Sequence, residues 1–540
     1  MLTLYTKNYK EFALLCSSKK PVHTFSGAKL ANKALPGDHV TAAAAAAGCT
    51  LVTRNQSLPI AGLLELSSKT KYGFTTKNHP IYLFIPFNEA YPPFVVGSSE
   101  RDTSRNRQAI IKFESWTTDT FPRGSLIKFL DSEEDALAWT YTPLACLPYK
   151  GAAAAAAAAV AAARPTIQAF HIDPLGCKDV DDVLTFDQQE GITYVTITIS
   201  DVAAHIPEGS PLDIRAQQIA QTFYGLKPRH MFPPELSEDR LSLLPGSSKL
   251  GLSLKFPIHD PTKVTWFESI VQCTQTYTYE SVYTDEPLCK LLTEMSQALG
   301  TKTDDSHKWI EAAMKFYNVQ AAILLHKAQV GLLRSHTAPD NDKLQSLTKI
   351  NPELQFLAYK SAVYVPATDP NPRHFGLAED FYCHATSPIR RYADLVNQRV
   401  IKKLLLNEQN LTAQEQSQHL AAHLNDRAKQ AKRHDRDLTF IRALKSGASQ
   451  VTGQVLELKA EDTNTRLSIY VPAWELTVKL RYKTLLQKSQ DQVTVISKDE
   501  TTEHTVAVGQ TVLMDYRADM TARNWKKRMV VRLTAGQATT

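Results

Sequence analysis

Four aspartates crowd into ten consecutive positions of this chain, between two apolar stretches. The segment HIDPLGCKDVDDVLTF carries Asp173, Asp179, Asp181 and Asp182. Carboxylates this close repel one another strongly once they lose their water, so a purely structural role is a poor reason to gather them. A fold of this chain must therefore either leave the segment in solvent or bring positive charge to it.

A divalent cation would supply that charge. Carboxylate oxygens without a His or Cys partner favour Mg²⁺, with Mn²⁺ as the alternative, over Zn²⁺. A calcium loop is a second reading, but the spacing lacks the regular pattern with a terminal Glu that such loops show. An exposed acidic turn stays open as the simplest alternative.

A second segment, FGLAEDFYCHATSPIRRYADLVNQRVIKKLL, predicts an amphipathic helix. Ser387 and Pro388 have the chemistry of N-cap and first-turn residues, which puts Arg390 and Arg391 in the opening turn. Backbone donors, the helix dipole and two guanidinium groups would then converge on a phosphate. Together with the acidic cluster, this pattern indicates displacement at phosphorus.

The chain has 540 residues, which is enough for several domains. Short alternating segments up to about residue 150 predict an all-β region of small barrels. After an Ala-rich linker over 151–165, longer strands and helical stretches over 166–446, including 307–336, indicate an α+β domain. The strands over 447–535 are again barrel-sized.

These motifs resemble the ribonuclease II (RNB) family of 3′–5′ exoribonucleases, in particular its DIS3-like branch without an N-terminal endonuclease domain. The match runs through IDPLGCKDVDD, ITISDVAAHI with Asp201, MFPPELSEDRLSLLPG, GLLRSH around Arg334, and ATSPIRRYADL. The resemblance implies a multidomain chain, with an α+β RNB catalytic domain flanked by all-β OB-fold barrels. One or two cold-shock-type barrels would lie within 1–150 and an S1-type barrel over 447–535.

The resemblance also implies roles for the acidic cluster. Asp173 and Asp182 would be direct Mg²⁺ ligands, Asp179 would help through a second ion or its waters, and Asp181 would orient the attacking water. The expected activity is processive, Mg²⁺-dependent two-metal hydrolysis of single-stranded RNA to nucleoside 5′-monophosphates.

Other side chains are expected to contact the RNA. By resemblance, Arg390 contacts the scissile phosphate and Arg391 supports it or the RNA path. Base stacking is assigned to Phe223 or, with a one-residue slip, Tyr224, and to Tyr279 near the 3′ end. Each aromatic has ordinary core packing as its alternative.

Further basic residues are candidates for phosphate contacts. These are Arg334 in GLLRSH and, in the last barrel, Lys526, Lys527 and Arg528, for which a solvated turn is the alternative. The net charge of +6 permits a polyanionic partner without requiring one.

The remaining composition predicts a soluble intracellular protein, cytoplasmic or in an organelle. The seven cysteines are scattered, which favours reduced thiols, and no apolar run reaches the length of a membrane span. The expected partners are single-stranded RNA and, in addition, a helicase or a larger RNA-processing complex. A weakly active or inactive RNB-fold protein that binds RNA within a ribonucleoprotein is the alternative function.

Overall fold

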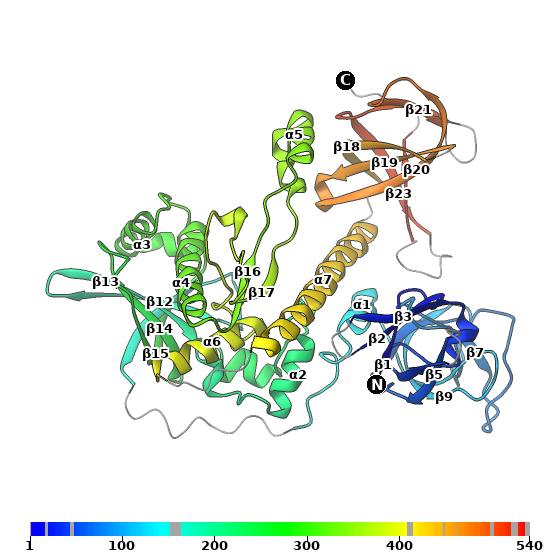
Figure 1. The fold of residues 1–540 in the computed structure, drawn as a ribbon, viewed down its shortest axis with the longest axis horizontal. Helices are drawn as coiled ribbons and strands as arrows, with labels where there is room; N and C mark the ends of the chain where they lie inside the picture. Colours follow the sequence, from blue (N-terminus) through cyan, green and yellow to red (C-terminus); the bar gives the residue numbers. More distant parts are fainter. Residues whose placement is uncertain are drawn as a thin grey trace. The chain divides into compact units, whose positions relative to one another are not determined.

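The computed structural model of this chain describes residues 2–16, 20–43, 48–151, 164–407, 414–446, 449–461, 463–496, 502–519 and 528–534. The chain divides into two compact units (Figure 1). The mixed α/β unit comprises Leu147–Asp340 and Tyr359–Gln430. The β-rich unit comprises Met1–Cys146, Asn341–Ala358 and Ala431–Thr540.

A closed five-stranded barrel forms the centre of the mixed unit. Its strands, in pairing order, are β11 (Thr166–Ile172), β12 (Asp182–Gln189), β13 (Ile192–Ser200), β14 (Lys249–Pro257) and β15 (Thr265–Tyr277). The first and last strands close the barrel in parallel, and the other pairs are antiparallel. Runs of Ile, Val and Thr such as ITYVTITIS suit this pleated surface because β-branched side chains pack well on it.

The register of the barrel determines where the acidic segment lies. The backbone N–H of Asp173 donates to the carbonyl of Tyr277 (3.1 Å), directly after β11 ends at Ile172. Asp182 opens β12 opposite Ile199. The loop over 173–181 therefore connects two paired strands at one end of the barrel.

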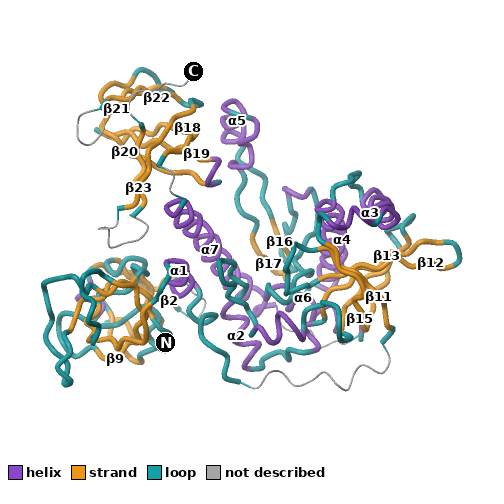
Figure 2. Tube along the Cα trace, turned by 180° about the vertical axis from the view of Figure 1, so that it is seen from behind, coloured by secondary structure: helices purple, strands orange, loops and turns teal. Residues whose placement is uncertain are grey.

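Helices, purple in Figure 2, accompany this barrel. Those that lie wholly in the mixed unit are α2 (Pro211–Ile219), α3 (Glu286–Ala298), α4 (Ser306–Ala328) and α6 (Tyr392–Leu405), and α3, α4 and α6 contribute to the hydrophobic core of the barrel. Trp309 and Tyr317 of α4 and Ile401 of α6 share one hydrophobic core with Leu254 and Phe256 of the barrel. A two-stranded sheet of β16 (Leu332–Ser335) and β17 (Val363–Pro366) lies beyond α4 in the chain. None of the helices in the described ranges has the length and apolar character needed to cross a membrane.

The N-terminal part of the β-rich unit contains two five-stranded sheets. The first has the order β3-β2-β1-β4-β5, and the second closes into a barrel in the order β10-β8-β7-β6-β9. The strands are β1 (Leu2–Thr6), β2 (Glu11–Leu15), β3 (Pro21–Ser26), β4 (His39–Ala42), β5 (Cys49–Thr53), β6 (Ile60–Leu64), β7 (Ile81–Pro86), β8 (Phe94–Gly97), β9 (Arg107–Ser115) and β10 (Arg123–Phe129).

The C-terminal part of this unit is a seven-stranded sheet in the order β22-β21-β20-β19-β18-β23-β24. Its strands are β18 (Gln450–Glu461), β19 (Asn464–Val471), β20 (Leu476–Gln487), β21 (Gln492–Ile496), β22 (Glu503–Ala507), β23 (Thr511–Ala518) and β24 (Met529–Leu533). The helix α5 (Asn341–Ile350) belongs to the same unit, and the long α7 (Gln414–Lys445) spans the division between the units. The S1-type assignment of these strands stays a prediction.

Two local expectations differ from the structure. The region before residue 150 is not purely β, because α1 (Glu133–Tyr141) forms there. Ser132 caps it by accepting a hydrogen bond from the N–H of Asp135, and acidic residues fill its first turn. The helix expected over 307–336 ends at Ala328, because Gln329 adopts the left-handed conformation (φ 57°) as its C-cap, and LLRS continues as β16. Residues 152–163 of the predicted linker lie outside the described residues.

Candidate active site

A neighbouring segment holds the acidic loop in place. The hydroxyl of Ser242 accepts a hydrogen bond from the N–H of Val180 (2.9 Å), and the N–H of Leu243 donates to the carbonyl of Val180 (2.9 Å). The N–H of Ser200 donates to the carbonyl of Asp181 (2.8 Å). The three hydrogen bonds determine the backbone path of the last residues before β12, so their side chains are directed by the fold.

The arginine-bearing segment is a tight turn that precedes the helix. The N–H groups of Arg390 and Arg391 both donate to the carbonyl of Ser387 (3.2 and 2.9 Å). The prediction that both arginines lie in the opening helical turn is wrong, since α6 begins at Tyr392. The physical reason is that the N–H of Tyr392 and the carbonyl of Arg390 pair with the segment 220–222, which holds Arg391 extended.

The turn and the acidic loop meet at Asp181. One oxygen of this carboxylate accepts a hydrogen bond from the N–H of Ile389 (2.9 Å), and the other accepts one from Nε of Arg390 (3.2 Å). Asp181 is only 4% exposed, whereas the side chain of Arg390 is 43% exposed. Burial raises the pKa of Asp181 to about 7, against the opposing effect of the Arg390 charge. The two motifs therefore form one site, with a buried carboxylate behind an accessible guanidinium.

Asp182 and Asp173 lie on either side of the loop. Burial raises the pKa of Asp182 well above its usual range, and the negative charges of Asp173 and Asp181 add to this effect. The carboxylate of Asp173 accepts a hydrogen bond from Nδ1 of the buried His171 (2.9 Å). The carboxylates are thus close enough to oppose each other's ionisation, which a bound cation would relieve.

The structure separates the two candidate stacking residues. Phe223 is 2% exposed, and its ring lies 5.4 Å from the guanidinium carbon of Arg427. Tyr224 is 46% exposed, and its hydroxyl donates to Oδ2 of Asp179 (2.9 Å). Phe223 has almost no surface to offer a base, whereas Tyr224 lies beside the acidic loop.

Tyr279 has one ring face already covered. It stacks on His307 with ring centroids 3.8 Å apart and 16° between the ring planes. Burial raises its pKa to about 12, and the charge of Asp173 adds to the effect. Tyr279 therefore lies within electrostatic reach of the acidic cluster.

Arg391 and Arg334 both contact other side chains of the mixed unit. Arg391 forms two hydrogen bonds to the buried Asp394, from Nε at 3.0 Å and from Nη2 at 2.8 Å. Arg334 lies over the ring of Tyr364, with its guanidinium carbon 4.4 Å from the centroid. Its Nη1 is buried, and no hydrogen-bond partner for it is present in the described part of the chain. Asp201, in another matched motif, is fully buried and paired with Lys402 (2.6 Å).

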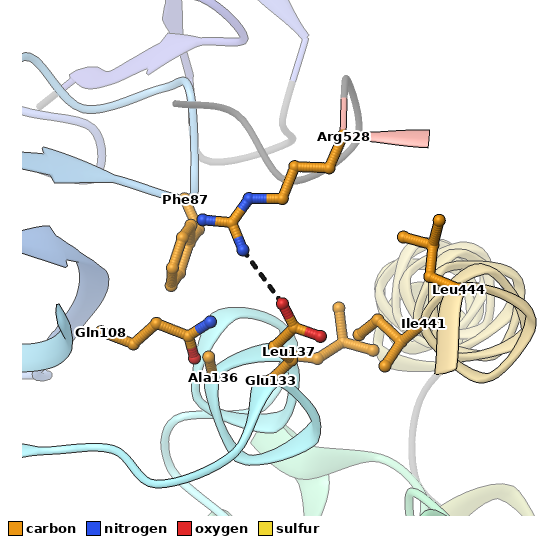
Figure 3. Close-up of a pocket in the computed structure, with 8 residues that line it drawn as sticks. All are labelled: Phe87, Gln108, Glu133, Ala136, Leu137, Ile441, Leu444 and Arg528. Atoms are coloured by element: carbon orange, nitrogen blue, oxygen red, sulfur yellow. Dashed lines mark hydrogen bonds and ion pairs between the residues drawn. The ribbon is translucent and has the colours of Figure 1, made fainter. Parts of the chain in front are cut away.

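The basic triplet near the C-terminus is described only at its last residue. Lys526 and Lys527 lie outside the described residues. Arg528 is buried, and Figure 3 shows its guanidinium directed at the carboxylate of Glu133, which it reaches at 3.0 Å. The charge of Arg528 is directed into the fold, beside Phe87 and Gln108, and its phosphate contact stays a prediction.

The acidic cluster fits a hard cation in donor type and in charge. Its donors are carboxylate oxygens, the ligands that Mg²⁺ and Mn²⁺ prefer. Within the described ranges, however, no three His, Cys, Asp or Glu side chains are grouped so that they could hold an ion as they stand. Protein partners engage three of the four carboxylates: His171 for Asp173, Tyr224 for Asp179 and Arg390 for Asp181.

Sequence reasoning missed several supporting groups. The contact of His171 could have been predicted, because His171 lies two residues before Asp173 and alternate residues of a strand share a face. The contacts of Ser242 and of the N–H of Ile389 could not, because both join segments far apart in the chain. Asp394 belongs to the quoted motif ATSPIRRYADL, but no pattern in the sequence indicated its pairing with Arg391.

Comparisons with known proteins find similarity to RNB-domain proteins. The RNB domain family model matches residues 166–286 and 351–407. Ribonuclease R of Helicobacter pylori is 27% identical over 372 residues, covering 53% of this chain and 57% of that protein. The probable exosome complex exonuclease RRP44 of Caenorhabditis elegans is 23% identical over 546 residues, covering 79% of this chain and 55% of that protein. The chain thus spans little more than half the length of these two relatives.

Solved structures share the fold over nearly the whole chain. Mycoplasma genitalium RNase R in complex with ribose-methylated single-stranded RNA matches with a TM-score of 0.68 and 16% identity, covering 99% of each chain. Yeast Ssd1, described as a pseudonuclease, matches with a TM-score of 0.65 and 14% identity, covering 99% of this chain and 96% of that one. The fold, the joined motifs and the family model agree that this chain carries an RNB domain, which the family model matches over residues 166–286 and 351–407.

Proposed function

We propose that this chain hydrolyses single-stranded RNA processively from the 3′ end and releases nucleoside 5′-monophosphates. The observation that carries the proposal is the contact of Asp181 with both Ile389 and Arg390. It joins the acidic loop to the one arginine of the turn that keeps a large exposed surface. A phosphate at this surface would meet a guanidinium and a carboxylate on the same side.

The protein groups would divide the work as follows. Arg390 would hold the scissile phosphate and neutralise the charge that develops on it. Asp181, held in place by Ile389 and Arg390, would orient the attacking water and accept its proton. The water oxygen bonds to phosphorus, the bond to the 3′ oxygen breaks, and a proton completes the leaving hydroxyl.

A divalent ion, Mg²⁺ or Mn²⁺, is part of the proposal. Asp173 and Asp182 would hold it, with help from Asp179. Bound there, it would lower the pKa of water and neutralise phosphate charge. Burial raises the pKa of Asp182, and repulsion from Asp173 and Asp181 adds to this effect, so a cation at this place would stabilise the charged form.

The RNA end would be held by stacking, which is tolerant of sequence because every base has a π-face. The exposed ring of Tyr224 is the better candidate than Phe223, and Tyr279 is the second. Two relatives are named as a ribonuclease and an exosome complex exonuclease, which supports RNA as the substrate and a larger complex as a further partner. A helicase partner is part of the proposal but has no such support.

End-labelled RNA tests the proposal. Purified protein with Mg²⁺ should release labelled mononucleotide at once from 3′-labelled single strands. From 5′-labelled strands it should produce a short final fragment. Internal cuts, or no mononucleotide at any concentration of Mg²⁺ or Mn²⁺, would contradict it.

A second candidate function is RNA binding without hydrolysis. The observation in its favour is that the carboxylates, within the described ranges, form no ready group of three ligands. RNA that stays intact yet bound with equal affinity in Mg²⁺ and in a chelator would favour this function.

A further inference from the structure

We infer that the hydroxyl of Tyr224 is a positioning group for the carboxylate of Asp179, so that one side chain links the stacking surface to a candidate metal ligand. The inference rests on the proposed function, because it assigns a purpose to a contact between two of that site's residues. It concerns the hydroxyl and not the ring, whose stacking is already part of the proposal.

The geometry gives Asp179 one strong partner. The hydroxyl of Tyr224 donates to Oδ2 at 2.9 Å, whereas the nearest partner of Oδ1 is the thiol of Cys177 at 3.9 Å. In the described chain, the phenol is therefore the short hydrogen bond that orients this carboxylate and leaves Oδ1 open.

The backbone near Tyr224 is held firmly enough to make the contact specific. The N–H of Thr222 donates to the carbonyl of Arg390 (3.0 Å). Phe223, next along the chain, exchanges two backbone hydrogen bonds with Arg229 (3.0 and 2.8 Å) and has its side chain buried. The backbone segment that leads to Tyr224 is thus hydrogen-bonded to the turn that carries Arg390. The ring of Tyr224 remains half-exposed, and its hydroxyl reaches Asp179.

Two consequences follow from this placement. Groups that hydrogen-bond a metal-ligating side chain tune its affinity for the ion, and their removal usually costs about 10–100-fold. A nucleobase that stacks on Tyr224 would also contact a ring whose hydroxyl is hydrogen-bonded to Asp179. Occupation of the stacking surface and the orientation of Asp179 are then coupled through a single phenol.

The experiment separates the hydroxyl from the ring. Mn²⁺ binding to the full chain is measured by electron paramagnetic resonance without RNA, and the final RNA fragment is measured on gels. Tyr224→Phe should weaken Mn²⁺ binding about tenfold or more and leave the fragment length unchanged. Tyr224→Ala should weaken Mn²⁺ equally and also change the fragment length.

Two further variants sharpen the result. Tyr283→Phe is the matched control, because it removes a phenol that hydrogen-bonds the carbonyl of Asp304 (3.1 Å) and not a carboxylate of the cluster. It should leave Mn²⁺ binding unchanged. If Tyr224 acts through Asp179, adding Tyr224→Phe to Asp179→Asn should cause little further loss.

The outcomes distinguish this inference from the proposed function. Tyr224→Phe binding Mn²⁺ as tightly as the parent, or more tightly, overturns the inference while an RNA-degrading parent upholds the function. A full additional loss in the double variant also overturns it. A parent that binds no Mn²⁺ and degrades no RNA overturns both.

Discussion

Asp394 clamps Arg391 with both carboxylate oxygens and, through Oδ1, also accepts a hydrogen bond from the N–H of Ser387 (2.8 Å). The first turn of α6 thereby holds both ends of the turn over 387–391. Arg390, which contacts Asp181, lies between these two anchors. The position of the accessible guanidinium of Arg390 consequently depends on the ion pair between Arg391 and the buried Asp394.

Replacing Asp394 by Asn should destabilise the protein by about 3–5 kcal/mol, because it leaves the charge of Arg391 without its partner in a buried place. The free energy of unfolding, measured with urea, checks this. Glu311→Gln removes a partner from the surface pair Lys308–Glu311 and should have little effect. Equal stabilities of Asp394→Asn and the parent would contradict the clamp.

Asp181→Asn should lower turnover by about two orders of magnitude or more, with RNA affinity nearly kept. The amide cannot accept a proton, and its NH₂ group would face the Nε–H of Arg390. Steady-state mononucleotide release measures turnover, and filter binding in a chelator measures affinity. The control is Asp187→Asn on the same strand as Asp182, which should behave as the parent. Unchanged turnover in Asp181→Asn would remove Asp181 from the catalytic residues.

Arg390→Lys should reduce turnover by about 10-fold or more. An ammonium cannot contact a carboxylate and a phosphate through one planar group. Arg373→Lys, an exposed arginine of the same unit, is the matched control. Turnover in Arg390→Lys equal to that of the control would show that a point charge is sufficient.

Phe223→Ala should affect stability, whereas Tyr224→Ala should affect the length of the final RNA fragment. Phe223→Ala removes a buried ring and should cost about 3–5 kcal/mol of stability without changing the final RNA fragment. Tyr224→Ala should change the fragment length with much less loss of stability. Thermal unfolding and gel analysis give the two readouts, and the reverse assignment of effects would show that Phe223 is the stacking residue.

The buried His374 should make the free energy of unfolding depend on pH. Burial lowers its pKa from 6.5 to about 4, with the charges of His336 and Arg334 adding to the effect. Between these values the unfolded chain binds more protons than the folded one, so this contribution to stability falls as pH drops from 6.5 toward 4. His374→Gln should lose stability less steeply than the parent over that interval. Parallel curves from urea unfolding at pH 7, 6 and 5 would contradict the assignment.

The local sequence pattern predicted the acidic cluster and the strands on either side of it. Apolar runs before Asp173 and after Asp182 predicted two strands, and the structure has β11 and β12 there. The mixture of strands and helices over 166–446 and the return to strands over 447–535 were also predicted, since period and composition are local properties. The cap of α1 was equally local, in the acidic residues after Ser132, yet it was overlooked within a β-rich region.

The start of α6 and the register of the stacking residue were not readable in this way. Arg391 has helix-compatible neighbours, but pairing with the segment 220–222 draws it into an extended conformation. Phe223 and Tyr224 are adjacent aromatics, and only packing against Arg427 or hydrogen bonding to Asp179 distinguishes them.

The sequence by itself determined that four carboxylates follow one strand, that two arginines precede one helix, and that β regions flank both. Tertiary structure alone decided that Asp181 meets Arg390, that Arg391 turns inward to Asp394, and that Arg528 pairs with Glu133. The reason is that periodicity records which face of an element is apolar. The partner of a buried charge, by contrast, depends on which distant segment the fold brings within about 3 Å of it.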